Sequence, residues 1–228
     1  MQLAAFEATA ASLAAHRVRY IVVGGLAVNA HGYLRFTKDI DLLIALASVN
    51  VRAAFAALAD TGYGPSAPVT AEGFSDAETR RSWIQEKDAP VLHFYSERYG
   101  TTAVAVFIEE PFDFDTEHAE AMVGQIAPRL SVRFVSLLTL IEMKQAADRP
   151  TDRDDIKHLR WMLEETGPAS RRADGTDWSA ATWEGSRREQ IRRSRQLTVR
   201  ERLEALDEIT ELAEWLGSLP QQTQNKPS

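Results

Sequence analysis

Hydrophobic positions along the chain switch between helical and strand-like spacing, and this pattern predicts a mixed α/β fold. The alanine-rich residues 2–16 place apolar side chains on one stripe, as a helix with one buried face requires. Residues 20–23 and 39–45 are short apolar runs typical of buried strands. Both alternating sets of the second run are apolar, which predicts a central strand covered on two faces. The further strands that we expect are 91–95 and 102–108, and the further helices are 26–31, 51–59, 135–147, 152–165, 183–195 and 199–216.

The same pattern divides the chain. Proline, glycine, serine and charged residues interrupt 64–90, which predicts turns or a flexible excursion there. Composition shifts again near residue 166, where glycine and proline indicate a linker. We therefore expect an α/β (α+β) fold with a small mixed sheet flanked by helices, plus a C-terminal helical segment. The predicted boundaries are a main domain at 1–165, a linker at 166–182, a helical module at 183–217 and a disordered tail at 218–228.

Two signals delimit the last helices. Thr198 with Glu201 forms a capping-box pattern, and apolar residues then recur at three- and four-residue steps. Thr151 with Asp154 forms a similar pattern before the 152–165 helix. The C-terminal helices are rich in arginine, which predicts either a patch for RNA phosphates or a solvated or intramolecular helix face.

Composition narrows the function classes. The chain of 228 residues has no cysteine, which excludes a disulfide framework and a thiolate metal site. Its formal net charge of −7 argues against a globally basic nucleic-acid binder. No apolar run approaches membrane-spanning length, and the first residues lack the pattern of a signal peptide. We expect a cytoplasmic protein with no membrane partner.

Two carboxylates stand at the start of the 39–45 strand. Residues two apart in a strand share a face, so Asp39 and Asp41 point the same way with backbones roughly 7 Å apart. Burying this charge is costly without a compensating partner. Two oxygen ligands at this spacing suit Mg²⁺, with phosphates completing its coordination.

A pair of glycines precedes these acids. Gly24 and Gly25 end the first strand and open a short helix, where free N–H groups and the helix dipole favour a phosphate. Thirteen residues separate Gly25 from Asp39, enough for a short helix and a return loop. Either motif alone is ordinary, but their order predicts a phosphate cradle beside a metal site.

This arrangement resembles a known family. Val23-Gly24-Gly25, followed after thirteen residues by Asp39-Ile40-Asp41-Leu42, is similar to the signature of the nucleotidyltransferase superfamily of polymerase-beta type. The run from Arg35 to Leu42 particularly resembles the AbiEii-like branch of bacterial toxin–antitoxin and phage-defence loci. The resemblance implies Mg²⁺-dependent (or Mn²⁺-dependent) transfer of a nucleoside monophosphate from an NTP to a hydroxyl of RNA, tRNA, protein or a small molecule.

Roles follow from the resemblance. Asp39 and Asp41 would be catalytic metal ligands, and Gly24, Gly25, Arg35 and Thr37 would bind the nucleotide. A second similar stretch, from Glu142 to Ile156, would supply Lys144 to the NTP phosphates.

The third acid of the superfamily is not evident. It is expected on the 102–108 strand near Ala105 or Phe107, and neither is acidic. Glu109 has the same strand parity as Ala105 and is our candidate for a further metal ligand. Asp155 is the rival third catalytic acid, and Asp113 is a weaker one that better fits a turn.

Two functional hypotheses therefore remain. The first is an active nucleotidyltransferase with Asp39, Asp41, Lys144 and Asp155 as catalytic residues. The second is a catalytically weakened protein of the same fold that acts as a toxin–antitoxin component through its C-terminal helices, with a cognate toxin or antitoxin as partner. Convergence of a third acid on Asp39 and Asp41 would favour the first.

Overall fold

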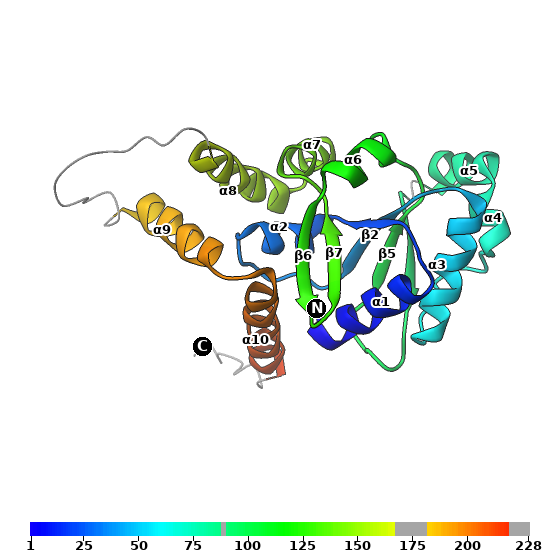
Figure 1. Ribbon diagram of the computed structural model, residues 1–228, viewed down its shortest axis with the longest axis horizontal. Coiled ribbons are helices and arrows are strands. Elements are labelled where there is room, and N and C mark those ends of the chain that lie inside the picture. Colours follow the sequence, from blue (N-terminus) through cyan, green and yellow to red (C-terminus); the bar gives the residue numbers. More distant parts are fainter. Residues whose placement is uncertain (88–89, 167–181, 219–228) are drawn as a thin grey trace, which may run out of the picture.

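A computed structural model describes residues 1–87, 90–166 and 182–218 and shows a seven-stranded mixed sheet with helices on both faces (Figure 1). The strand order is β3-β4-β5-β2-β1-β7-β6. The predicted α/β fold with a mixed sheet is confirmed. The strands are β1 (Tyr20–Val22), β2 (Ile40–Ile44), β3 (Gly64–Pro65), β4 (Val91–Tyr95), β5 (Val104–Phe107), β6 (Met122–Ala127) and β7 (Leu130–Phe134).

Every helix predicted from the hydrophobic spacing is present, with small shifts of its ends. Helix α8 begins at Pro150, whose fixed φ suits a first helical position, rather than after a cap at Thr151. The helices are α1 (Leu3–Ala15), α2 (Gly24–His31), α3 (Ser48–Asp60), α4 (Ala71–Ser75), α5 (Ala77–Lys87), α6 (Phe114–Glu120), α7 (Leu137–Ala147), α8 (Pro150–Thr166), α9 (Trp183–Gln196) and α10 (Val199–Ser218).

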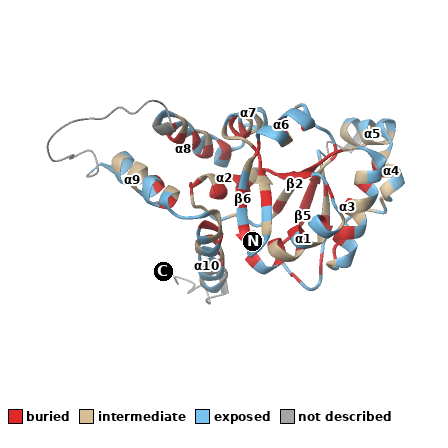
Figure 2. Cartoon of the chain, viewed as in Figure 1, coloured by how far each residue is buried: buried red, intermediate tan, exposed pale blue. Residues whose placement is uncertain are grey.

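The central strands are buried on both faces, as the doubly apolar pattern of β2 predicts (Figure 2). Helices α1 and α3 cover one face, where Phe6 of α1 packs against Phe134 of β7 with ring centroids 6.3 Å apart. Leu42 lies on this face, because it pairs through Val22 with Phe134. Helix α2 lies against the opposite face, toward which the neighbouring Asp41 points, and α7 packs on α2.

Two regions have more structure than the sequence indicates. Residues 64–90, expected as turns, contain β3, α4 and α5, and the side chain of Phe74 is fully buried between Phe55 and Trp83. Residues 113–134 contain α6 and the hairpin of β6 and β7. Asp113 is the N-cap of α6, accepting from the N–H of Thr116 at 2.8 Å, so its expected turn is a helix start.

The C-terminal helices pack on the main domain. Leu203 and Leu206 of α10 are fully buried, and α10 contacts α1, α2 and β6. The predicted capping box is confirmed: Thr198 N donates to Glu201 Oε2 at 2.7 Å, and Glu201 N donates to Thr198 Oγ1 at 3.2 Å. Most of the predicted linker (166–182) and of the predicted tail (218–228) lies outside the described residues.

Arg202 of α10 joins three helices. Its guanidinium is buried and donates to the carbonyls of Ser194, Arg195 and Leu197 at the end of α9, at 2.8–2.9 Å. It also donates to the carbonyl of Ala30 in α2. One member of the C-terminal arginine cluster is thus an intramolecular clamp.

Among the described residues, no helix combines the length and apolarity needed to cross a membrane.

Candidate functional site

Gly24 and Asp41 bring the two sequence motifs together. The strand pairing of β1 and β2 continues through a hydrogen bond from Val23 N to Asp41 O at 2.9 Å, which sets the turn into α2 beside the acid. Gly24 has a positive φ of 63°, and a Cβ atom built on it would lie 1.9 Å from Asp41 Oδ2. Two features therefore require glycine at residue 24: its positive φ, and the Asp41 carboxylate that would collide with a side chain.

Asp41 is held in an unfavourable electrostatic environment. Burial and the neighbouring Asp39 raise its pKa to about 6, against the opposing influence of the Gly25 N–H, Lys144 and Arg149. A divalent cation between the two carboxylates would relieve both causes. The residues present fit Mg²⁺ or Mn²⁺, which is commonly bound by one or two carboxylates together with substrate phosphates.

The N-terminus of α2 lies against two further polar side chains. A Cβ on Gly25 would lie 2.4 Å from Thr37 Oγ1 and 3.4 Å from Arg35 Nη1. The hydroxyl of Thr37 and the guanidinium of Arg35 thus lie against the first turn of α2, whose start also packs against Asp41. The structure brings Gly24, Gly25, Arg35 and Thr37 together, and this set of donors suits an anion such as a polyphosphate.

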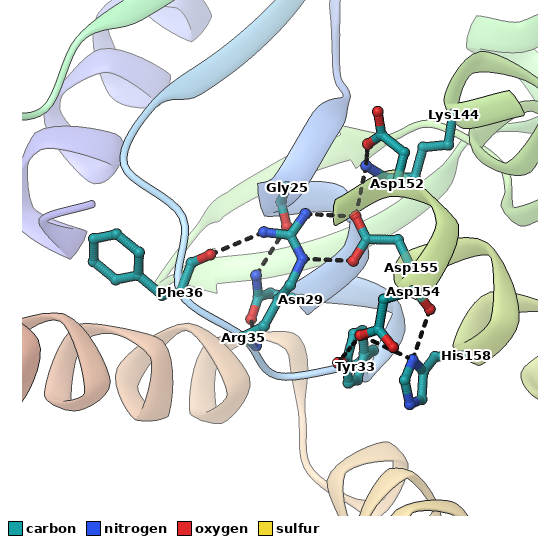
Figure 3. Close-up of polar contacts among 10 residues, drawn as sticks. All are labelled: Gly25, Asn29, Tyr33, Arg35, Phe36, Lys144, Asp152, Asp154, Asp155 and His158. Atoms are coloured by element: carbon teal, nitrogen blue, oxygen red, sulfur yellow. Dashed lines mark hydrogen bonds and ion pairs between the residues drawn. The ribbon is translucent and has the colours of Figure 1, made fainter. Parts of the chain in front are cut away.

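Asp155 connects the two cationic side chains of the site (Figure 3). Arg35 donates to it through Nε and Nη2 at 2.5 and 2.6 Å, and Lys144 Nζ lies 2.7 Å from its Oδ2. Lys144 also donates to Asp152 Oδ1 at 2.7 Å. Lys144, Asp152 and Asp155 are all buried, so each charge depends on the others for compensation. Asp155 is therefore a positioning residue for Arg35 and Lys144.

Asn29, which sequence reasoning did not single out, fixes the loop that carries Arg35. Its buried side chain donates to Gly25 O at 2.8 Å and accepts from Arg35 N at 2.9 Å (Figure 3). The amide thus ties the glycine turn to the arginine. A single asparagine within the otherwise apolar run 26–30 is the sequence signal that could have found it, because a buried polar side chain needs hydrogen-bond partners.

Glu109 does not lie with the carboxylate pair. Asp41 pairs with Ala105 in the parallel strands β2 and β5, so Glu109 follows four residues later, roughly 13 Å along the strand. It is exposed, and the adjacent Glu110 accepts from the N–H of Leu46 beyond the far end of β2. Glu109 lies beyond the end of β5, so the strand does not carry it to the end of the sheet where Asp41 lies.

The other two candidates for a third acid are engaged elsewhere. Asp113 caps α6, and Asp155 holds Arg35 and Lys144. Within the residues that the structure describes, no group of three or more acidic, histidine or cysteine side chains could jointly hold a metal ion. The site consists of two carboxylates beside a set of anion-binding donors.

No protein-family model matches the chain, and no curated protein does. The solution structure of the antibiotic-resistance factor ANT(2'')-Ia is similar with a TM-score of 0.47 and 17% identity, covering 92% of this chain and 97% of that one. The lincosamide antibiotic adenylyltransferase LnuA, in its lincomycin-bound crystal structure, is similar with a TM-score of 0.38 and 15% identity, covering 63% of this chain and 87% of that one. An assignment of activity rests on the geometry of the site and not on these similarities.

Proposed function

We propose that this protein is a nucleotidyltransferase that moves a nucleoside monophosphate from an NTP to a hydroxyl acceptor, with Mg²⁺ or Mn²⁺. The observation that supports the proposal is the close packing of Gly24 against Asp41, because the start of α2, where N–H groups can bind an anion, then lies beside the carboxylate pair. A divalent cation held by Asp39 and Asp41 would offset the repulsion between these carboxylates and a bound phosphate chain.

Each residue has a distinct task in this reaction. Asp39 and Asp41 would hold the divalent cation, which supplies charge neutralisation at the phosphates when bound. The N–H groups at Gly24 and Gly25, with Thr37, would orient the phosphate chain. Arg35 and Lys144 would stabilise negative charge on the phosphates, with their positions fixed by Asp155.

The transfer itself needs little covalent chemistry from the protein. The acceptor oxygen attacks the α-phosphorus, the bond from that phosphorus to the bridging oxygen breaks, and pyrophosphate leaves. Positioning in line and charge stabilisation supply most of the acceleration. The acceptor in this reaction would be RNA or protein, and the protein would act in a toxin–antitoxin or phage-defence system, as the resemblance to the AbiEii-like branch implies.

The test measures which phosphate of a labelled NTP is transferred to an acceptor. The protein is incubated with each NTP labelled at either the α- or the γ-phosphate, with Mg²⁺ and with total RNA, protein or hydroxylated small molecules as acceptors. Nucleotidyl transfer labels an acceptor from the α-position only. Asp39→Ala abolishes this label, whereas Asp115→Ala, which removes an exposed partner of Arg19, leaves it unchanged. Label that persists in Asp39→Ala contradicts the proposal.

A second candidate is a nucleotide-binding protein that does not turn over and acts as a toxin–antitoxin component through its C-terminal helices. The observation in its favour is that only Asp39 and Asp41, and no third acid, face the cradle among the described residues. This function predicts that the protein binds Mn²⁺ and NTP but labels no acceptor in the same experiment.

A further inference from the structure

One row of residues crosses three neighbouring strands beside the site. Asp41 of β2 pairs with Ala105 of β5, and Ala105 pairs with His93 of β4. Directly paired residues point to the same face of a sheet, so His93 shares the face of the carboxylates. Strands are about 4.8 Å apart, which puts the Cα atoms of His93 and Asp41 roughly 10 Å apart.

The alternation along β4 fixes the direction of His93. Leu92 and Phe94 are buried on the opposite face, where Phe94 packs edge-on against Phe55 of α3. His93 is half-buried, and its ring stacks on that of Tyr95, with centroids 6.2 Å apart and an interplanar angle of 12°. Tyr95 is 55% exposed, so the ring pair stands at an accessible edge of the site.

Small side chains separate the histidine from the acids. Ala105 lies between them in the row. Ala103 precedes it by two residues and shares its face, and the carbonyl of Ala103 accepts from Ile40 N at 2.9 Å. Both alanines are buried, and neither carries a proton acceptor. His93 and Asp41 therefore flank a position of the row whose side chain is a single methyl group.

Nucleotidyl transfer requires a proton acceptor at this place. The acceptor hydroxyl must lose its proton as it attacks, and Asp39 and Asp41 are occupied by the cation in the proposed reaction. Histidine is the side chain most often used for such a transfer. On β4 and β5, the residues that share this face are Val91, His93, Tyr95, Ala103, Ala105 and Phe107, and His93 is the basic side chain among them.

We propose that His93 is the general base of this protein, in place of a third carboxylate. This inference rests on the proposed function and names a further catalytic residue for it. A ring nitrogen of His93 takes the proton of the acceptor hydroxyl, the hydroxyl oxygen bonds to the α-phosphorus, and pyrophosphate leaves with the electron pair of the broken bond. The imidazolium then returns its proton to solvent.

The first test is geometric and needs no turnover. Mn²⁺ with a non-hydrolysable NTP analogue is titrated into the protein while the ring protons of its histidines are followed by NMR. The His93 signals broaden and those of His118, which stacks on Phe114 of α6, do not. The broadening disappears in Asp41→Asn. Unbroadened His93 signals at saturating Mn²⁺ overturn the inference, because the ring would then not face the metal site.

The second test is kinetic. His93→Ala lowers kcat by about 100-fold or more, whereas its affinity for the Mn²⁺–nucleotide complex stays within about twofold of wild type. Added imidazole restores the rate of His93→Ala by about tenfold or more, and it has no effect on Asp39→Ala. The matched control His118→Ala keeps the wild-type rate.

The outcomes separate the two proposals. A His93→Ala rate within about threefold of wild type, or a reduced rate that imidazole does not raise, overturns the role of His93 and leaves the transferase intact. A wild-type protein that labels no acceptor overturns the transferase and its general base together. A loss of Mn²⁺–nucleotide affinity in His93→Ala overturns the catalytic role in favour of a structural one.

Discussion

Gly24 and Asp41 are packed so closely that residue 24 has no room for a side chain. Gly24→Ala would force the Asp41 carboxylate to move and would place a methyl group on a backbone with φ of 63°. We expect a loss of about 1–2 kcal/mol in the free energy of unfolding from the left-handed conformation alone. We also expect Mn²⁺ affinity to fall by about tenfold or more, since the carboxylate is displaced. Thermal unfolding and Mn²⁺ titration measure the two effects.

Gly64→Ala is the matched control for this substitution. A Cβ atom at Gly64 meets nothing within 4 Å, so both stability and Mn²⁺ affinity should stay near wild type. Equal effects of the two substitutions would show that the contact of Gly24 with Asp41 is not the cause.

The raised pKa of Asp41 predicts a specific pH dependence of stability. Its pKa of about 6 in the folded protein lies above the ordinary value of 3.8, so the folded state binds the proton more tightly. In the metal-free protein this contribution to stability is complete below about pH 4 and is lost as pH rises through 6, at a cost of about 2–3 kcal/mol. Asp41→Asn should remove this dependence and be more stable than wild type at pH 7, as urea unfolding at a series of pH values measures.

Two further measurements constrain the interpretation. Mg²⁺ with NTP at pH 7 should stabilise the wild type and not Asp41→Asn. Asp113→Asn should change stability at pH 7 in the opposite direction to Asp41→Asn. Hydrogen bonds from Thr116 lower the pKa of Asp113, so its ionised carboxylate stabilises the folded protein above the ordinary titration range of an aspartate. A wild-type stability that does not change between pH 4 and about 7 would contradict the assigned environment of Asp41.

Asp155 should be far more important for stability than an exposed aspartate with a similar partner. Asp155→Asn leaves the buried Lys144 and the half-buried Arg35 without their shared carboxylate, and we expect a loss of about 3–5 kcal/mol. The exposed pair of Asp148 and Arg153 has two similar hydrogen bonds at 2.9 and 3.1 Å, and Asp148→Asn should leave stability close to wild type because solvent screens this pair. Urea unfolding of both variants makes the comparison, and similar losses would contradict it.

Nucleotide affinity gives a second readout for Asp155. Because it positions Arg35 and Lys144 without facing the carboxylate pair, Asp155→Asn should weaken NTP binding more than Mn²⁺ binding measured without nucleotide. A larger effect on Mn²⁺ alone would restore Asp155 as a metal ligand.

Arg202 is expected to stabilise the protein through its buried hydrogen bonds. Arg202→Met keeps much of the apolar stem and removes the donors to four carbonyls, with an expected loss of about 2–4 kcal/mol. Arg193→Met, which removes an exposed partner of Glu189, should cost about 0.5 kcal/mol or less. Thermal or urea unfolding of the two variants decides between an intramolecular clamp and a surface charge.

The parts of the site that could be predicted from sequence are those set by local geometry. The period of a strand puts Asp39 and Asp41 on one face, and glycine before a helix predicts the close approach to Asp41. The sequence also predicts the capping box at Thr198, because its partners are three residues apart.

Contacts between distant residues could not be predicted in this way. Arg35 and Asp155 are 120 positions apart, and nothing local shows that their charges meet. Glu109 fails for a related reason: strand parity gives the face of a side chain but not its place along the neighbouring strand, which depends on the register of β2 with β5. The β6–β7 hairpin was missed because its strand Met122–Ala127 includes Gly124 and Gln125 and lies at the sheet edge, where apolar residues are needed on one face only.

The clamp at Arg202 also bears on where the protein can be divided. Three of the carbonyls that accept from Arg202 belong to the end of α9, and the fourth belongs to α2, the helix whose other end packs against Asp41. The change in composition near residue 166 therefore does not mark the edge of a cooperative unit. A fragment that ends there would lose the docking partners of α2 and β6, and supplying 182–218 as a separate peptide would be the natural route to reconstitute it.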